Sequence, residues 1–530
     1  MPNAAEAEIY STSHKLRKLT KWQATIQPIT IRLAPFIGNT NHSSSQTGQM
    51  MATDKYDFGM VGLGVMGRNF ALNVADNGFS VIGLDTNSEQ ASALEAEAAG
   101  KEVKGTTDAV EFVAGLSQPR RIMLLVPAGK IVDGVIESLL PHLDQDDLII
   151  DGGNSYFEDT DRRIAYLNEK GIRFLGVGVS GGAEGARRGP SIMPGGNKEA
   201  YQSVSQILEA VSAKVGDDPC VDFMGHRSAG NYVKMVHNGI EYAMMQLLAE
   251  SYDILKRVGG LTNSQLQATY QSWNESELQS FLVEITAEIF GQPDDLGDGS
   301  LIDKILDKAK QKGTGKWTSQ HAMDLGVPVP TIDSAVTMRG ISSFKGQRSE
   351  NEQFFNLEAR PPVKLSAEDQ ERFVDEVRRS VLFGFIVSYA QGLALLVEAS
   401  EEKEYDLNLE SCARIWRGGC IIRSALLEDI RRAYSEDSGL KNLMFSPVFK
   451  ERLIDSQAAC RNVIQVAVEH AVPSLTLGSA LNYFDAFRTG RLPLNLVQAQ
   501  RDFFGSHTYE RTDRDGVFHS QWNSKEALAE

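Results

Sequence analysis

Most of this chain falls into two regions that differ in the spacing of their apolar residues. Between residues 54 and 229, short apolar runs alternate with stretches whose apolar positions recur every three or four residues. The short runs are expected to be strands, and they lie at 55–62, 79–85, 121–126, 148–153 and 172–179. The stretches between them, such as 65–78 and 91–102, are expected to be helices. This alternation predicts an α/β domain with a mostly parallel sheet covered on both faces.

Residues 230–489 carry only the helical rhythm. Apolar positions recur at helical spacing in segments such as 247–258, 277–290, 372–400 and 459–472. No strand-like alternation returns after residue 230, so one large all-α domain is expected.

The two ends of the chain follow neither rhythm. Residues 490–530 lose the helical pattern but carry large aromatic side chains at Phe503, Phe504, Phe518 and Trp522. Because such a surface is costly to leave in water, we expect this tail to pack on a second subunit. Residues 1–53 are rich in Ser, Thr, Asn and Gln and are expected to be a disordered leader. An organellar transit peptide is the alternative.

Composition narrows the function classes. The formal net charge of −17 argues against general binding to nucleic acid or to an anionic membrane. No apolar run approaches the roughly 18 residues that span a bilayer. The four cysteines are scattered without metal-binding spacing, which indicates a reducing compartment. A cytoplasmic protein is expected, with import into an organelle through residues 1–53 as the alternative.

The first predicted strand ends in a glycine-rich turn of the form GxGxxG, formed by Gly62, Leu63, Gly64, Val65, Met66 and Gly67. Such a turn lets a pyrophosphate approach the backbone and the N–H groups that open the next helix. The turn follows a strand and precedes an acidic residue, Asp85, about 20 residues on, so a Rossmann-type dinucleotide site is expected. A carboxylate at this position favours an unmodified ribose over a 2′-phosphate, and Thr86 and Asn87 add no positive charge. This loop suits NAD better than NADP.

Two further glycine-rich turns follow later strands. Asn154 comes after Gly152 and Gly153 at the end of a predicted strand, where open α/β sheets bind their ligands. The sequence Ser180-Gly181-Gly182 can offer backbone N–H groups to an anion such as a carboxylate. Taken singly, either stretch is equally well explained by glycines that form turns.

The segment from Gly230 to Gln246 combines a polar stripe with apolar residues on its other faces. At helical period the stripe contains Asn231, Lys234, His237, Asn238, Glu241 and Tyr242. Lys234 and Glu241 are about 10 Å apart along the helix axis, so both could reach one small substrate. The alternative is a solvated face of no catalytic importance.

A possible phosphate site lies farther on. Residues 311–319 resemble a nucleoside-triphosphate loop, but Lys310 and Trp317 stand where that motif needs Gly and a hydroxyl residue, so we reject it. Lys312 and Thr314 could still bind a phosphate, and Arg339 could add a bidentate contact.

Seven motifs occur in one order over residues 56–522: GLGVMG, IIDGGNS, the glycine-rich stretch from GVSGG to MPGGNKEA, VKMVHNGIEY, QKGTGKWT, WRGGCIIR and QAQRDFFGSHTYE. Together they resemble the 6-phosphogluconate dehydrogenase family, decarboxylating enzymes of the pentose phosphate pathway. The resemblance implies a homodimer whose C-terminal tail enters the partner's active site. The expected parts are a leader at 1–53, a dinucleotide-binding Rossmann-type domain at 54–229, an all-helical substrate and dimerisation domain at 230–489, and the tail at 490–530.

The resemblance also implies roles for individual residues. It makes Lys234 the general base and later acid, and Glu241 the general acid, in conversion of 6-phosphogluconate to ribulose 5-phosphate and CO2. Beside the cofactor it places residues 62–67, Asp85, Thr86, Asn87, Val126, Pro127, Ala128 and Asn154. Around the substrate it places Asn154, Ser180, Gly181, Gly182, His237, Asn238, Tyr242, Lys312, Thr314 and Arg339, with Arg501 and His507 from the partner. No metal is expected, because the β-keto acid formed by oxidation accepts the electrons of decarboxylation itself.

Departures from the family pattern concern the cofactor. Members that use NADP usually have Asn-Arg-Thr at positions 85–87 and Lys at position 127, where this chain has Asp-Thr-Asn and Pro. The resemblance therefore implies NADP, whereas Asp85 favours NAD or use of both.

Two other functions are weighed against this one. A β-hydroxyacid dehydrogenase of the 3-hydroxyisobutyrate type would share the glycine turn and a lysine helix, but would lack this length of helical domain. A non-catalytic dinucleotide-binding protein would have no need to retain both Lys234 and Glu241.

Overall fold

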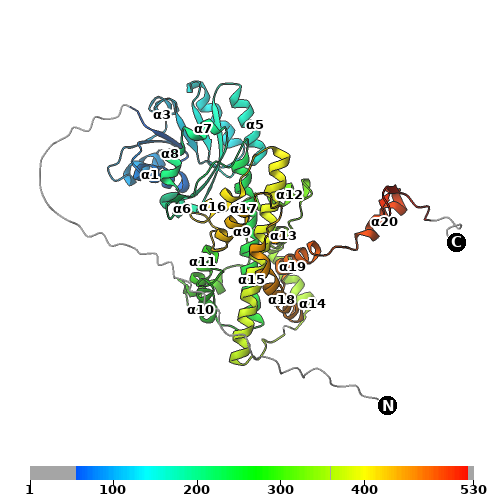
Figure 1. Cartoon of the computed structure of the whole chain (residues 1–530). Helices are drawn as coiled ribbons and strands as arrows, with labels where there is room; N and C mark the ends of the chain where they lie inside the picture. Colours follow the sequence, from blue (N-terminus) through cyan, green and yellow to red (C-terminus); the bar gives the residue numbers. More distant parts are fainter. Residues whose placement is uncertain (1–54, 359, 523–530) are drawn as a thin grey trace, which may run out of the picture. The chain divides into compact units, whose positions relative to one another are not determined.

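The computed structural model describes residues 55–358 and 360–522 (Figure 1). The first part is a seven-stranded sheet in the order β3-β2-β1-β4-β5-β6-β7. Neighbouring strands run parallel from β3 to β6, and β7 runs antiparallel to β6. The strands are β1 (Phe58–Val61), β2 (Val81–Leu84), β3 (Val103–Thr106), β4 (Arg121–Leu124), β5 (Leu148–Asp151), β6 (Arg173–Ser180) and β7 (Ser191–Gly196).

Helices cover both faces of this sheet, because alternate side chains of the strands enter two separate apolar cores. In β1, Phe58 and Met60 join one core, and Val61 joins the other. The first core also takes side chains from α1 (Val65–Asp76), α2 (Ser88–Glu97), α6 (Gly182–Arg188), α7 (Lys198–Gln202) and α8 (Ser205–Val211). The second takes them from α3 (Ala109–Ala114), α4 (Lys130–Leu139) and α5 (Phe157–Asn168). The predicted Rossmann-type α/β domain is confirmed.

The second part is built around two long helices. The helix α9 (Ala229–Arg257) contacts β6 and β7 on one side and α15 (Ala367–Lys403) on another (Figure 1). The remaining helices of this part are α10 (Asn263–Trp273), α11 (Phe281–Gly291), α12 (Thr314–Asp324), α13 (Pro330–Ser343), α14 (Lys345–Phe355), α16 (Leu409–Trp416), α17 (Leu426–Glu436), α18 (Pro447–Glu469) and α19 (Leu475–Phe487). Except for α14, these helices contribute side chains to one apolar core, so the predicted all-helical region is confirmed.

Local sequence explains where several of these helices begin. The Thr262 side chain accepts from the backbone N–H of Gln265, and the Gln265 side chain accepts from the backbone N–H of Thr262. These two hydrogen bonds form a capping box at the start of α10. Ser366 caps α15 through its side chain, which accepts from Asp369 N at 3.1 Å. Pro447 occupies the first turn of α18, where its missing N–H costs nothing.

The prediction that no apolar run approaches membrane-spanning length is wrong. Among the described residues, α15 is long and apolar enough to cross a bilayer by length and composition. However, 89% of its most apolar 18-residue window is buried inside the protein. Its apolar surface packs against neighbouring helices such as α9 and α18.

The tail differs from its prediction as well. Instead of losing helical structure, it contains α20 (Leu494–Gly505) and a two-stranded antiparallel pair, β10 (Tyr509–Glu510) and β11 (Val517–Phe518). The Asp502 carboxylate accepts from Thr508 N, Ser520 N, His519 Nδ1 and Trp522 Nε1, and so joins the helix to the strands. Leu496, Phe503 and Phe504 of α20 are more than half exposed in this chain.

Two strands of the seven-stranded sheet were not predicted from the sequence. Both β3 and β7 are edge strands, and β7 (SIMPGG) contains Pro194 and two glycines, which are typical of turns. A proline is tolerated there because β7 makes only isolated bridges with the described residues on the side away from β6, at Ile192 and Gly195. The prediction that residues 1–53 are a leader or transit peptide concerns residues outside the described part of the chain.

Candidate active site

Four neighbouring strands end at one edge of the sheet, and each is followed by a predicted site turn. Strands β1, β4, β5 and β6 are adjacent and parallel, so Gly62, Val126, Asn154 and Ser180 come at the same edge. Open α/β sheets bind ligands at this carboxyl edge.

The geometry of the first turn requires its glycines. Gly62 has φ +90°, and a Cβ on it would lie 2.7 Å from the carbonyl oxygen of Leu125. A Cβ on Gly67 would overlap the Gly62 carbonyl oxygen, so only glycine allows α1 to approach β1 this closely. Gly64 has open space on its side-chain face, and α1 has no side-chain cap. The first N–H groups of α1 are therefore available to a pyrophosphate, and the turn fits a dinucleotide.

Asp85 is fixed beside this turn. Its Oδ2 accepts from Leu63 N at 2.7 Å, and its Oδ1 accepts from Asn87 N at 2.9 Å. Thr86 and Asn87 are exposed, and the Asn87 side chain caps α2. The nearby Arg68 guanidinium donates to Gln90 and Glu97. A carboxylate is therefore held at the end of β2, directly beside the glycine-rich turn.

The next two turns lie against each other. A Cβ on Gly153 would be 3.3 Å from the carbonyl oxygen of Val126. Pro127, Ala128 and Asn154 are exposed at the surface of these turns. The structure thus brings the predicted cofactor residues of the β4 and β5 turns together.

Glycines in the sheet bring α9 close to it. A Cβ on Gly178 in β6 would lie 2.4 Å from Lys234 Cβ, and a Cβ on Gly230 in α9 would lie 2.3 Å from the carbonyl oxygen of Gly176. A Cβ on Gly195 in β7 would come within 2.2 Å of Gly230 N. The role of these glycines was not predicted, although their alternation in RFLGVGVS could have indicated a close helix.

Lys234 is buried, with an exposed fraction of only 6%. Its Nζ donates to Ser180 Oγ at 3.0 Å and lies 3.4 Å from His237 Nδ1. Burial lowers the pKa of Lys234, and the carboxylate of Glu241 opposes this shift. Burial together with Lys234 holds the pKa of His237 well below its usual value, so the imidazole is neutral at pH 7.

Glu241 lies two turns farther along the same face. Its side chain is 19% exposed, and Oε2 is 4.0 Å from His237 Nδ1. Burial raises the pKa of Glu241, whereas Lys234 and Arg339 act to lower it. The Arg339 guanidinium stacks 3.3 Å above the ring of Tyr242, so these two predicted residues also meet here. The structure therefore brings an amine of lowered pKa and a carboxyl of raised pKa to one polar face.

The predicted phosphate residues reach this face through α12. Asn238 Oδ1 lies 3.1 Å from His237 Nδ1, and Asn238 Nδ2 donates to Thr314 Oγ1 at 3.1 Å. Thr314 is the first residue of α12, which has Gly313 as its uncapped N-terminal neighbour. Lys312 is exposed just before it. The free N–H groups at the start of this helix attract anions, as do the positive charges of Lys312 and Arg339.

A loop from the WRGGC motif adds residues that were not predicted. Trp416 is fully buried and packs edge-on against the His237 ring, with centroids 5.6 Å apart. A Cβ on Gly181, where φ is +112°, would lie 2.5 Å from the Gly419 carbonyl oxygen. Gly182, with φ +63°, opens α6 directly after it. The sequence showed this motif only as part of a resemblance, because a loop 180 residues downstream gives no local signal of this contact.

Arg501 and His507 do not join the other site residues within the described part of one chain. Arg501 is exposed and donates to Gln498 Oε1 at 3.0 Å. His507 is exposed, with its ring 6.1 Å from that of Phe504. Both contacts lie inside the tail.

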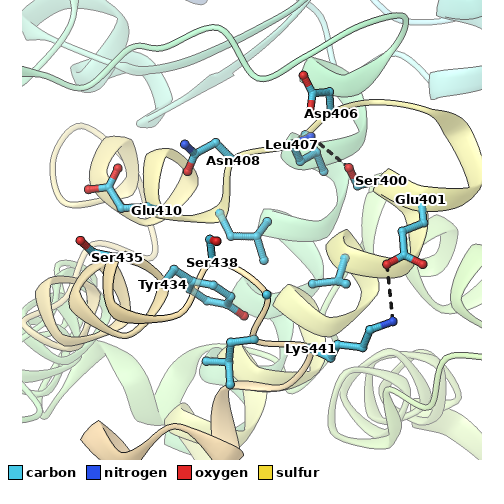
Figure 2. Close-up of a pocket in the computed structure, with 14 residues that line it drawn as sticks. Ser400, Glu401, Asp406, Leu407, Asn408, Glu410, Tyr434, Ser435, Ser438 and Lys441 are labelled. Carbon is cyan, nitrogen blue, oxygen red and sulfur yellow. Dashed lines mark hydrogen bonds and ion pairs between the residues drawn. The ribbon is translucent and has the colours of Figure 1, made fainter.

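A cavity of about 680 Å³ lies elsewhere, between the end of α15, α16 and α17 (Figure 2). Figure 2 shows Glu401, Asp406 and Glu410 around it, with Lys441 3.5 Å from Glu401. None of its lining residues is a predicted site residue. This cavity is therefore separate from the candidate active site.

Comparison with known proteins extends these observations. The family model described as the C-terminal domain of 6-phosphogluconate dehydrogenase matches residues 230–522. The model described as the NAD binding domain of 6-phosphogluconate dehydrogenase matches residues 57–225. Since the first model covers the helical region, the shorter β-hydroxyacid dehydrogenase is not favoured.

The sequence of this chain matches individual relatives over most of their length. The chain is 51% identical over 468 residues to 6-phosphogluconate dehydrogenase, NADP(+)-dependent, decarboxylating, of Bacillus subtilis (strain 168), covering 88% of this chain and 99% of the relative. It is 48% identical over 471 residues to the chloroplastic 6-phosphogluconate dehydrogenase, decarboxylating 3, of Arabidopsis thaliana, covering 88% and 96%.

A solved structure of Plasmodium falciparum 6-phosphogluconate dehydrogenase, studied in apo form and in complexes with its cofactor NADP+ and its substrate 6-phosphogluconate, superposes with a TM-score of 0.85. It is 43% identical and covers 88% of this chain and all of its own. With matches over both domains, this chain belongs to the 6-phosphogluconate dehydrogenase family.

Proposed function

We propose that this protein oxidises and decarboxylates 6-phosphogluconate to ribulose 5-phosphate and CO2, using a nicotinamide dinucleotide. The observation that carries the proposal is the polar face of α9, where buried Lys234 and partly buried Glu241 lie two turns apart and have pKa values displaced toward each other. Pairs of groups displaced in this way suit general base and general acid roles near neutral pH.

Lys234 acts first as the base. Its lowered pKa makes a neutral amine accessible, and that amine takes the proton of the substrate's 3-hydroxyl. When bound, the dinucleotide accepts the hydride that leaves C3, which gives a 3-keto acid. Ser180 Oγ, 3.0 Å from Nζ, orients the amine toward the substrate.

Lys234 then acts as an acid, and Glu241 completes the reaction. As the C1–C2 bond breaks and CO2 leaves, its bonding electrons pass to C2 and C3, and charged Lys234 protonates the developing enolate oxygen. The raised pKa of Glu241 keeps a carboxyl proton available, and Glu241 delivers it to the enediol carbon that becomes C1 of ribulose 5-phosphate, while neutral Lys234 takes the proton back from the enediol oxygen, which becomes the ketone.

The remaining polar residues hold the substrate. Asn154, Ser180, Gly181, Gly182, His237 and Asn238 would bind its carboxylate and hydroxyls. Tyr242, Lys312, Thr314 and Arg339 would bind the 6-phosphate. Support comes from two contacts of the catalytic face: the Asn238–Thr314 hydrogen bond connects it to the start of α12, and the Arg339–Tyr242 stacking connects it to α13.

We further propose that the enzyme prefers NAD or uses both dinucleotides, although the Bacillus subtilis relative is named NADP(+)-dependent. The support is the fixed carboxylate of Asp85 beside Gly62–Gly67. It would accept hydrogen bonds from ribose hydroxyls and repel a 2′-phosphate.

The assembly that we propose is a homodimer in which Arg501 and His507 of the tail complete the partner's phosphate site. The tail supports this because Leu496, Phe503 and Phe504 are more than half exposed in the single chain. We place the enzyme in the cytoplasm, with an organellar location through residues 1–53 as the alternative, since one relative is chloroplastic.

The decisive assay measures initial rates with 6-phosphogluconate and each dinucleotide in turn, recording reduced cofactor and CO2 together. We expect equal amounts of both products. Reduced cofactor without CO2, or activity on 3-hydroxyisobutyrate instead, would overturn the proposal.

A further inference from the structure

A buried arginine connects the two turns that follow β4 and β5. Arg163, on α5, is 1% exposed. Its Nη2 donates to the carbonyl oxygen of Gly129 at 3.0 Å, in the turn after β4. Its Nη1 lies 3.3 Å from Asp151 Oδ2 and 3.4 Å from Ser155 Oγ, in the turn after β5. One planar guanidinium therefore contacts both turns at once.

Asp151, the last residue of β5, holds the turn that follows this strand through hydrogen bonds. This carboxylate, also 1% exposed, accepts from Gly153 N at 3.0 Å and from Ser155 Oγ at 2.6 Å. These two bonds come from the residues on either side of Asn154. They fix the backbone that presents the Asn154 side chain at the surface.

Two further contacts anchor this arrangement to helices. Arg163 Nε donates to Asp133 Oδ1 at 2.8 Å, in the first turn of α4. From α9, Asn231 Nδ2 donates to the carbonyl oxygen of Gly153 at 3.3 Å. The helix that carries Lys234 is thus joined to the same turn that Arg163 supports.

A fully buried arginine–aspartate pair is costly to desolvate, and apolar residues of similar volume would often be as stable. What such a pair provides is geometry, because its donors and acceptors fit in one arrangement only. Here that arrangement sets the distance between two turns that both bear predicted cofactor residues.

We propose that Arg163 is a positioning residue for the reaction, which sets the spacing of the turns at 126–129 and 152–155 and so aligns the nicotinamide with C3 of the substrate. It does this through Gly129, Ser155 and Asp151, without touching cofactor or substrate. This inference rests on the proposed function.

The test compares Arg163→Lys with Arg162→Lys in the full chain. Lysine keeps a positive charge beside the buried carboxylate, but its single head group cannot reach both turns. Arg162 is the matched control, because it lies next in sequence and also pairs with Asp133, yet it is 55% exposed and contacts neither turn.

Two quantities are measured for each variant: the separate kcat and KM values, and the primary deuterium isotope effect with 6-phosphogluconate deuterated at C3. For Arg163→Lys we expect kcat to fall about tenfold to a hundredfold, since small misplacements of reacting groups slow the chemical step that much. We also expect a larger isotope effect, because hydride transfer then limits the rate. Arg162→Lys should match the wild type in both.

A folded Arg163→Lys protein with wild-type kcat and isotope effect would overturn the inference, as would an equal loss in Arg162→Lys. If Arg163→Lys does not fold, Ser155→Ala decides, since it removes one contact of the second turn only. We expect a smaller fall in kcat with a raised isotope effect, and an unchanged isotope effect would refute the role of Arg163. A wild-type enzyme that is inactive on 6-phosphogluconate would instead refute the proposed function.

Discussion

At the scale of single residues, burial acts in opposite directions on the two ionisable groups of the α9 polar face. It lowers the pKa of Lys234, by disfavouring the ammonium, and raises the pKa of Glu241, by disfavouring the carboxylate. Their mutual attraction reduces both shifts. Because the groups are coupled, a pH profile reports the pair rather than either residue alone.

The pH dependence of kcat/KM follows from these roles. The rate should rise with pH as Lys234 loses its proton, at a pH below the ordinary lysine value. It should fall again as Glu241 loses its proton, at a pH above the ordinary glutamate value. Replacing Glu241 by Gln should lower the rate by about 10²–10⁴-fold and abolish the falling alkaline limb. An alkaline limb that persists in Glu241→Gln would show that another group is the acid.

Cofactor choice is also decided by few residues. In the double variant Asp85→Asn, Thr86→Arg, a repelling charge is replaced by a guanidinium that can contact a 2′-phosphate. We expect the ratio of kcat/KM for NADP to that for NAD to rise by about tenfold to a hundredfold, the effect of one or two charge-assisted hydrogen bonds. Glu89→Gln, which removes an exposed charge four residues from Asp85, should leave the ratio almost unchanged. A wild-type enzyme already selective for NADP would contradict this interpretation of Asp85.

At the scale of elements, the position of Lys234 depends on a helix that lies unusually close to a sheet. A Cβ on Gly178 would meet Lys234 Cβ at 2.4 Å and the Gly230 carbonyl oxygen at 3.0 Å, so α9 or the lysine must move. We expect Gly178→Ala to lower the free energy of unfolding by about 1–3 kcal/mol. It should also reduce kcat by about tenfold or more through displacement of the base.

The matched control is Gly134→Ala, in α4, where a Cβ meets nothing within 4 Å. Alanine in that helix should stabilise the protein by about 0.5–1 kcal/mol and leave kcat unchanged. Thermal unfolding and steady-state rates measure both variants. Wild-type kcat in Gly178→Ala would mean that this close packing does not set the position of Lys234.

Some of these elements could be predicted from the sequence, and others could not. Strands with apolar runs, such as LIID in β5, were predictable because their apolar residues form one continuous buried run, and the polar stripe of α9 was predictable from its helical spacing. The strand β7 was not, since Pro194 and its glycines indicate a turn, and only pairing with β6 makes the segment a strand. The contact of Trp416 with His237 joins residues 179 positions apart, which no local pattern encodes.

At the scale of the whole molecule, the proposed dimer makes each active site from two chains. Co-expression of Lys234→Ala with the double variant Arg501→Ala, His507→Ala tests this directly. Each parent should be nearly inactive, but a mixed dimer pairs an intact Lys234 with an intact tail in one of its two sites. Random assembly then predicts about a quarter of wild-type activity.

The control co-expresses Lys234→Ala with Glu241→Gln. Both changes lie in the body of the chain, so every site in a mixed dimer lacks one of the two groups and no activity should return. Equal recovery in both mixtures, or none with the tail variant, would argue against a tail that completes the partner's site.

The central claim is that Lys234 on α9 performs the chemistry, and its most direct test is turnover of Lys234→Ala measured beside dinucleotide binding in the same preparation. Lys256→Ala is the control, because Lys256 lies on the same helix but pairs with Asp303 away from the polar face. We predict that Lys234→Ala loses CO2 production by roughly 10³-fold while binding the dinucleotide as the wild type does, and that Lys256→Ala keeps its activity. Near-normal CO2 production by Lys234→Ala would contradict the account.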